Sequence, residues 1–245
     1  LVFGNRHDRN RKEGNKMENK MEEISSQRKL EALEENGTFI RKDGKTFLQL
    51  DCENAKELSM KWGEKLYPFT KTGKKWILEL PFSTAVNYVQ ICVDGQEVLS
   101  PELPIAHGYG RPYNYIELPD EDGLFELRDV PHGTLTQEFY KSKISDNWEK
   151  LILYLPPCVP SAGLPVLYLQ HGFGESEISW STTGKVNILM DNLIAAGKIK
   201  PFAIVMGNGM VKQRIDGKLK LNPALYGQML VEEILPMLEK KYQFG

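Results

Sequence analysis

The sequence predicts two folded parts, a small all-β sandwich over residues 36–120 and an α/β domain that starts at residue 124. The first prediction rests on short alternating or apolar runs, which turn residues separate at regular intervals. The second rests on apolar strand runs that alternate with segments of helical period. This alternation is typical of a doubly wound α/β sheet.

Residues 1–35 precede both parts and differ from them in composition. Charged residues, Asn and Gly dominate the first half, and a weak apolar stripe of Ile24, Leu30 and Leu33 follows. Such a segment cannot bury a core, so we expect a mobile or helical extension. No apolar run of about 7–15 residues follows the basic residues. No signal peptide is therefore visible, and the sequence leaves secretion and cytoplasmic residence both open.

Five strands are expected in the first part, at residues 38–42, 45–52, 55–62, 74–81 and 87–94. Turn pairs such as Asp43-Gly44 and Asp94-Gly95 separate them. Glycine in such a pair tolerates the positive φ that a type I′ hairpin requires. We do not expect a disulfide-bridged immunoglobulin domain.

Aromatic residues are frequent in this part, among them Trp62, Tyr67, Phe69 and Trp76. They could form a face that stacks on sugars, but aromatic residues in so small a sandwich more often fill its core. His107 lies among Gly and Pro residues without a neighbouring ligand or carboxylate. We expect it to be a solvated loop residue.

Three segments of this part, 51–60, 87–104 and 109–119, resemble the early-set, immunoglobulin-like domain that precedes the catalytic domain in many carbohydrate-active enzymes. The resemblance is carried by an "AKELSM" strand, by "YVQICVDG" and by "YGRPYNYIELP". The sequence has Ser100-Pro101 where that family commonly has Asp-Pro.

The α/β part begins with a hairpin, because strands at 134–144 and 147–157 flank the turn Ser145-Asp146-Asn147. Continuous apolar runs at 165–174 and 202–206 are expected to be buried central strands. Helices are expected to begin near Val186 and near Ala224, with Gly197 ending the first and Pro236 kinking or dividing the second. The hairpin strands should run antiparallel to the rest of a mixed sheet.

Composition excludes several classes of protein. The 245 residues include 31 basic and 33 acidic side chains, a net charge of −2, which gives no case for nucleic-acid binding. No stretch approaches the roughly 20 apolar residues of a membrane helix. The three cysteines, Cys52, Cys92 and Cys158, form no C-x-x-C pair, which argues against a disulfide framework or a zinc site. We expect Cys52 and Cys92 to be reduced, buried and neighbours in the core of the first part.

The strand at 165–170 ends at His171-Gly172, and the sequence around it resembles a family of esterases. That family includes family-one carbohydrate esterases, feruloyl and acetylxylan esterases and enterochelin-esterase-like hydrolases. The resemblance covers residues 171–209, with H-G-x-G-x-x-E-x-x-W at its start and the run Asp191–Ile199 in its middle. It implies the N-terminal part of an α/β-hydrolase fold. Gly207 and Met210 depart from the family, which commonly has Pro and an aromatic residue there.

The resemblance also implies site residues. The backbone N–H of Phe173 would be an oxyanion donor, and His171 would have a structural role. Trp180 and Asn208 would contact substrate. The alternatives are that Trp180 packs the loop onto the sheet and that Asn208 only shapes its turn. No cofactor and no metal are implied.

The nucleophile elbow G-x-S-x-G of such hydrolases is absent from the 245 residues. Ser176, Ser179 and Ser181 lie near the His-Gly turn without the glycines of an elbow. We therefore expect the chain to be the first part of a longer esterase, inactive alone, with its triad encoded beyond residue 245. The second half would be continuous sequence or a separate chain.

The expected function is a carboxylic ester hydrolase that removes feruloyl or acetyl groups from plant polysaccharide. Neither a nucleic acid nor a membrane is an expected partner. The alternative is a non-catalytic module that binds glycan or a partner and carries a degenerate hydrolase portion. A third possibility is a fragment that assembles with a separate second half.

Overall fold

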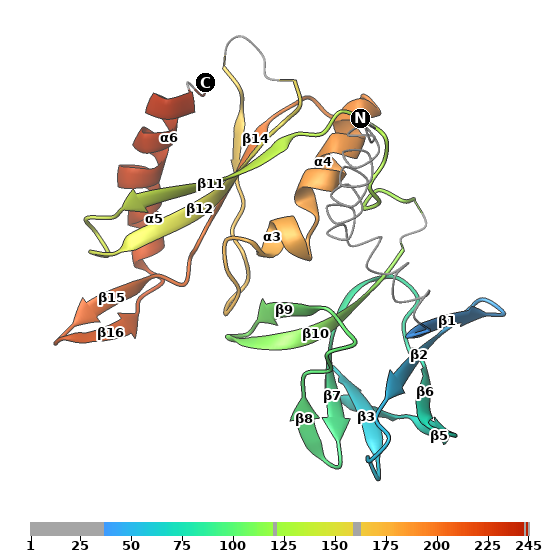
Figure 1. Cartoon of the computed structure of the whole chain (residues 1–245). Helices are drawn as coiled ribbons and strands as arrows, with labels where there is room; N and C mark the ends of the chain where they lie inside the picture. The colour runs from blue at the N-terminus through green and yellow to red at the C-terminus, as the bar shows by residue number, and fades with distance from the viewer. Residues whose placement is uncertain (1–36, 120–121, 159–162, 243, 245) are drawn as a thin grey trace, which may run out of the picture. The chain divides into compact units, whose positions relative to one another are not determined.

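The computed structural model describes residues 37–119, 122–158, 163–242 and 244, so the extension expected at 1–35 lies outside it (Figure 1). The described residues form two compact units. The first unit contains the residues up to Pro104 and those from Asn114 to Pro119. The second unit contains Ile105–Tyr113 and the residues from Asp122 onward. Residues 105–113, which the sequence analysis placed in the small β part, are thus grouped with the second unit.

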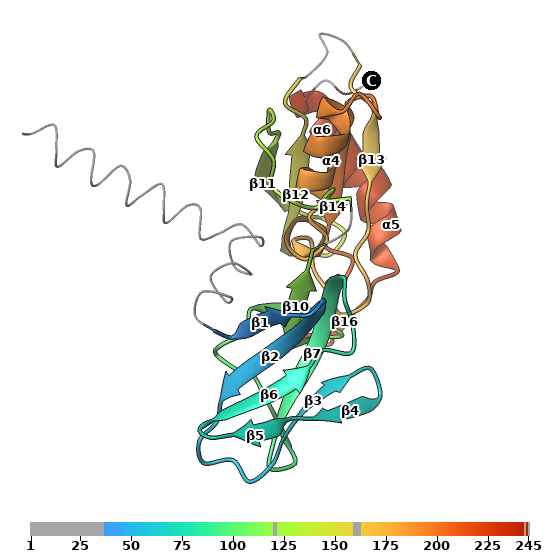
Figure 2. The same cartoon turned by 90° about the vertical axis from the view of Figure 1, so that its right-hand side faces the viewer.

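The first unit is built on two sheets (Figure 2). One has the order β1 (Phe39–Lys42), β2 (Lys45–Asp51), β6 (Lys75–Glu79), β5 (Thr70–Thr72). The other has the order β4 (Lys65–Pro68), β3 (Leu58–Trp62), β7 (Ala85–Val93), β10 (Arg111–Leu118), β9 (Ile105–Gly108), with β8 (Gln96–Val98) beside β7. Of these strands, β9 and the first residues of β10, as far as Tyr113, are grouped with the second unit. The strand registers are antiparallel, as expected.

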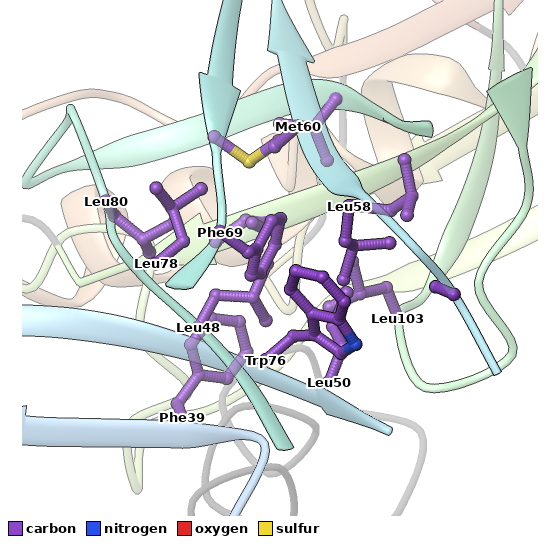
Figure 3. Packing of buried hydrophobic residues seen from close by; sticks show 14 of the residues in the cluster. Phe39, Leu48, Leu50, Leu58, Met60, Phe69, Trp76, Leu78, Leu80 and Leu103 are labelled. Atoms are coloured by element: carbon purple, nitrogen blue, oxygen red, sulfur yellow. The ribbon is translucent and has the colours of Figure 1, made fainter. Parts of the chain in front are cut away.

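Apolar residues from both sheets meet in one core (Figure 3). Leu48, Leu50 and Trp76 enter it from the first sheet, and Leu58 and Met60 from the second. Because alternate residues of a strand point to the same face, each sheet contributes one of its faces to this core. The core interpretation of the aromatic residues is confirmed for Phe69 and Trp76, which are buried; Trp62 and Tyr67 pack partly buried against the same core.

The two cysteines of the first unit are free thiols but are not neighbours in the core, so that expectation was wrong. Cys52 follows β2 in the first sheet and is only half-buried. Cys92 is buried on β7 of the second sheet, opposite Ser59 on β3. Its strand neighbour Ile91 points into the core, so strand alternation turns Cys92 to the other face. Burial, and then the charge of Glu97, raise the pKa of the Cys92 thiol.

We expect an aromatic disulfide reagent to label the three thiols at different rates in the native protein. Cys158 is exposed and should react first, and Cys92 should react slowest because its raised pKa leaves less thiolate at neutral pH. Mass spectrometry of quenched samples measures the order. Unfolding in denaturant should make the three rates equal, and fast labelling of native Cys92 would contradict its burial.

The second unit contains a mixed sheet of the order β11 (Thr134–Lys141), β12 (Trp148–Leu155), β14 (Ala203–Gly207), β13 (Val166–Tyr168). As expected, the sheet is mixed. Strand β12 pairs antiparallel with its hairpin partner β11 and with β14, whereas β13 and β14 pair parallel. The inner strand β14 is buried throughout and β12 is buried from Leu151 to Tyr154, because helices cover both faces of the sheet there.

The two faces of this sheet carry different helices (Figure 1). Helix α4 (Val186–Ala195) packs through Val186 and Met190 on the face of Tyr154 and Ile204. On the opposite face lies the helical segment α5 (Leu225–Met229), η1 (Leu230–Ile234) and α6 (Leu235–Tyr242), through Ile234 and Leu238. The expected helix starts at Val186 and near Ala224 are confirmed.

Pro236 is the second residue of α6, and it does not divide the last helical segment in two, because residues 225–242 are helical throughout. A proline has no N–H for the carbonyl four residues earlier, so the regular α-helical bonding pattern cannot pass through it. The structure accommodates this with the π-helical turn η1 immediately before α6.

In the small β part, the short strands β4, β5, β8 and β9 were not expected. Within residues 122–244, two further elements were not expected. One is the short helix α3 (Ser179–Thr182), and the other is the exposed hairpin of β15 (Lys212–Ile215) and β16 (Lys218–Leu221). The Asp216-Gly217 pair was a hairpin signal in the sequence that the analysis did not use. No helix within the described ranges is long and apolar enough to span a membrane.

Candidate functional site

The loop that follows β13 is anchored by His171, whose side chain is buried. The backbone N–H of Gly209 donates to His171 Nε2 at 3.0 Å, and His171 Nδ1 lies 2.7 Å from the Gly172 carbonyl oxygen. A ring that accepts at Nε2 and donates from Nδ1 satisfies both partners, so the geometry selects that neutral tautomer. His171 thus ties its own loop to the loop after β14.

A tight turn follows at residues 172–175. The Glu175 N–H donates to the Gly172 carbonyl at 3.1 Å, and the Gly172 N–H donates to the Glu175 carboxylate at 3.0 Å. Gly174 has φ +80°, which suits the third position of a type II turn. Its own N–H points to the sulfur of Met210 at 3.3 Å.

Phe173 differs from its neighbours in this turn. Within the part of the chain that the structure describes, the N–H groups of Gly172, Gly174 and Glu175 all have acceptors, whereas that of Phe173 has none. The Phe173 side chain is 71% exposed. A hydrogen-bonded turn with one unused N–H, in a residue that is exposed, is the geometry that an oxyanion donor requires.

The hairpin tip Tyr109-Gly110, which belongs to the same unit, lies against this turn. The Gly110 N–H donates to the Gly174 carbonyl at 2.9 Å. A Cβ atom on Gly174 would lie 2.5 Å from Tyr109 Cα and would also collide with the Gly110 nitrogen. Only glycine allows so close an approach of two backbones.

The last residue of β14 explains one departure from the esterase pattern. A Cβ atom on Gly207 would overlap the hydroxyl of Tyr226, which hydrogen-bonds to the Gly207 backbone. The Tyr226 side chain therefore occupies the space that a larger residue at 207 would need. Burial raises the pKa of Tyr226 to about 12, so the phenol stays neutral in this position.

The structure places the two candidate substrate residues in local contacts. The indole N–H of Trp180 donates to the Gln170 carbonyl at 2.9 Å, and the Asn208 carboxamide oxygen accepts from the Met210 N–H at 2.9 Å. The Trp180 bond agrees with the alternative that this residue packs its loop onto the sheet, and the Asn208 bond agrees with the alternative that it shapes its turn. A contact of either residue with substrate stays a prediction. His107 lies exposed on β9 rather than in a loop.

Asp191, the first residue of the matched run 191–199, is a buried hub that sequence reasoning did not single out. Its carboxylate accepts from the Tyr154 hydroxyl at 2.6 Å, from the Gly133 N–H at 3.0 Å and from His132 Nδ1 at 2.9 Å. His132 Nε2 also lies 3.1 Å from the Arg128 carbonyl, so a doubly protonated ring satisfies both acceptors.

Two neighbours of Asp191 hold the same connecting segment. The Asn192 amide donates to the Leu124 and Glu126 carbonyls at 2.8 and 2.9 Å, and the Lys185 ammonium donates to the Phe125 carbonyl at 3.1 Å. Burial lowers the pKa of Lys185 to about 8. These residues of the family motif therefore fasten residues 124–133 to α4 and the residue before it.

No nucleophile and base are brought together within the described ranges. Both ring nitrogens of His132 and of His171 face backbone or carboxylate partners, and none faces a serine hydroxyl. The Ser179 and Ser181 hydroxyls bond to backbone groups of their own loop. The described residues also contain no cluster of His, Cys, Asp and Glu that could hold a metal ion.

Comparison with known proteins finds esterases. Residues 142–244 match the family model described as "Putative esterase". A curated relative from Xylanibacter ruminicola, named endo-1,4-beta-xylanase/feruloyl esterase, is 33% identical in an alignment of 173 residues that covers 67% of this chain and 24% of the relative. The chain thus spans about a quarter of the length of that relative.

Among solved structures, the enterobactin esterase FES of Shigella flexneri, determined in the presence of enterobactin, aligns with a TM-score of 0.59 and 11% identity. The alignment covers 84% of this chain and 64% of that one. A ferulic acid esterase of Anaeromyces mucronatus in complex with ferulic acid aligns with a TM-score of 0.44 and 22% identity, over 51% of this chain and 49% of that one. The first of these shows an esterase-like hydrolase fold.

Proposed function

We propose that this chain, whose residues 142–244 match the esterase family model, is part of a carboxylic ester hydrolase that works by serine acyl transfer. The described residues supply the oxyanion loop. The nucleophile, the acid and the catalytic histidine come from sequence outside the 245 residues, since no G-x-S-x-G elbow occurs within them.

The unused N–H of Phe173 is the observation that carries this proposal. When a serine attacks the ester carbonyl, negative charge develops on the carbonyl oxygen, and a preorganised N–H stabilises it. His171 and the Gly172–Glu175 bonds hold the turn, so the donor needs no reorganisation during the reaction.

The substrate class that we propose is plant polysaccharide that carries feruloyl or acetyl groups. The name of the Xylanibacter ruminicola relative supports this class, because it couples xylan cleavage with feruloyl ester hydrolysis. Trp180 and Asn208 are proposed to border the substrate site beside the oxyanion turn. The first unit is proposed to be an early-set, immunoglobulin-like domain, in keeping with its two packed antiparallel sheets.

A second candidate is a non-catalytic module that binds glycan or a partner. It is favoured by one observation, the lack of a nucleophile paired with a base among the described residues. The two candidates differ in whether a serine elbow follows in the complete coding sequence.

We expect the 245-residue chain alone not to turn over methyl ferulate or p-nitrophenyl acetate, because an oxyanion donor without a nucleophile and base gives only residual catalysis. The protein that includes the downstream elbow should hydrolyse such esters at an ordinary rate of about 1–10³ per second. Substitution of the elbow serine by alanine should abolish that activity. Turnover at an ordinary rate by the isolated chain would overturn the proposal that the catalytic triad lies outside the 245 residues. Ser176, Ser179 and Ser181 would then be tested as nucleophiles.

A further inference from the structure

The hairpin turn beside the oxyanion turn has an unusual residue. Tyr109 and Gly110 connect β9 to β10 with φ of +51° and +79°, as a type I′ turn requires. Three other two-residue turns in the described chain have the same backbone, and each has aspartate in the first position: Asp43, Asp94 and Asp216. Asp, Asn and Gly tolerate this conformation, whereas a bulky side chain is strained in it.

The fold gains no burial from this tyrosine. The Tyr109 side chain is 77% exposed, so its ring fills no core that would offset the strain. Its backbone, in contrast, is held firmly against Gly174 through the Gly110 hydrogen bond. The hairpin turn therefore presents an aromatic ring to solvent, and its backbone contacts Gly174, the residue that follows Phe173 and its unused N–H.

A second aromatic ring and a cation stand beside Tyr109. The Tyr113 ring lies 6.2 Å from the Tyr109 ring at an interplanar angle of 70°, and the Arg111 guanidinium lies 4.5 Å from the centre of the Tyr113 ring. Two rings set nearly at right angles form a corner rather than a flat platform. A planar aromatic ring can stack on one of them and meet the other edge to face.

From this geometry, and resting on the proposed esterase function, we propose that Tyr109, Arg111 and Tyr113 form a subsite for the aromatic ring of an aryl acyl ester. The corner suits a flat aryl group better than a sugar, which needs one broad face. The guanidinium of Arg111 adds a positive charge that favours an electron-rich phenolic ring. Tyr109 is then a specificity-determining residue, because an acetyl group is too short to use the corner.

The test is Tyr109→Asn in the complete enzyme, assayed on methyl ferulate and on an acetylated xylo-oligosaccharide. Asparagine suits the positive φ, so the variant should fold at least as well as the parent while lacking the ring. We expect KM for methyl ferulate to rise about 3- to 10-fold, with kcat little changed, and KM for the acetylated sugar to stay the same. Tyr109→Phe should behave like the parent.

The matched control is Phe139→Ala, which removes an exposed aromatic ring of the same unit on β11 and should change neither KM. An unchanged KM for methyl ferulate in Tyr109→Asn, or an equal rise for both substrates, would overturn the aryl subsite. A rise for the acetylated sugar alone would mean that the cluster binds the sugar instead.

A second measurement separates this inference from the proposed function. NMR titration of the 245-residue chain with ferulic acid should show weaker binding for Tyr109→Asn than for the parent. If the complete protein hydrolysed neither ester, the proposed function would fail, and this titration would still decide the subsite. Equal binding by parent and variant would refute it.

Discussion

Replacement of Asp191 by alanine is expected to lower the free energy of unfolding by about 2–5 kcal/mol. The carboxylate is 2% exposed and accepts from the Tyr154 hydroxyl and the Gly133 N–H, and Tyr154 is fully buried. Burial, reinforced by Asp191, raises the pKa of Tyr154, so the phenol remains a neutral donor that needs an acceptor. Each buried donor left without a partner costs roughly 1–3 kcal/mol. Urea unfolding curves measure the loss.

Asp191→Asn is the informative comparison. Its carboxamide oxygen can still accept from Tyr154 and Gly133, and its NH₂ can donate to a neutral His132 whose Nε2–H bonds to Arg128. We therefore expect a loss of only about 1 kcal/mol, mostly from the weaker, uncharged hydrogen bonds. Glu239→Ala, an exposed carboxylate on α6, should stay within about 0.5 kcal/mol. Equal losses of unfolding free energy in the alanine and asparagine variants would contradict the conclusion that the hydrogen bonds to residue 191 stabilise the fold.

Replacement of Gly174 by alanine is expected to destabilise the second unit by about 2–5 kcal/mol and to remove esterase activity in the complete enzyme. The positive φ of +80° costs an alanine about 1–2 kcal/mol. The added Cβ would also lie 2.5 Å from Tyr109 Cα, and such overpacking costs roughly a further 1–3 kcal/mol. Because the turn must shift to relieve the clash, the Phe173 N–H should leave its position.

Gly217→Ala separates the two causes. Gly217 has φ +75° in the same unit, and a Cβ atom there would meet nothing within 4 Å. This variant should lose only the cost of the left-handed backbone and should keep full activity. Thermal unfolding and ester hydrolysis, measured side by side on both variants, give the result. Equal stability losses would show that the approach of Tyr109 to Gly174 does not constrain the turn.

Local patterns in the sequence were enough for the order of most strands and helices and for the His-Gly turn. Hydrophobic periodicity and turn pairs act over a few residues, so they located the β11–β12 hairpin, the buried strand β14 and the start of α4 at Val186. The hydrogen bond from the Gly209 N–H to His171 agrees with the structural role that the resemblance implied for this histidine. The same local signals misjudged Cys92, because they do not state which face of β7 meets the other sheet.

Only the tertiary structure decided which distant residues meet. Nothing near Asp191 in the sequence marks Tyr154 or Gly133 as its partners, since these contacts join segments more than 30 residues apart. The approach of Tyr109 to Gly174 arises in the same way, from the docking of a hairpin tip on a turn 65 positions later in the chain. The sequence by itself thus determined most of the strands and helices and the resemblance of the His-Gly loop to the esterase family. The packing of those elements determined which N–H remains unused and which aromatic residues stand beside it, because burial and hydrogen-bond partners depend on neighbours in space.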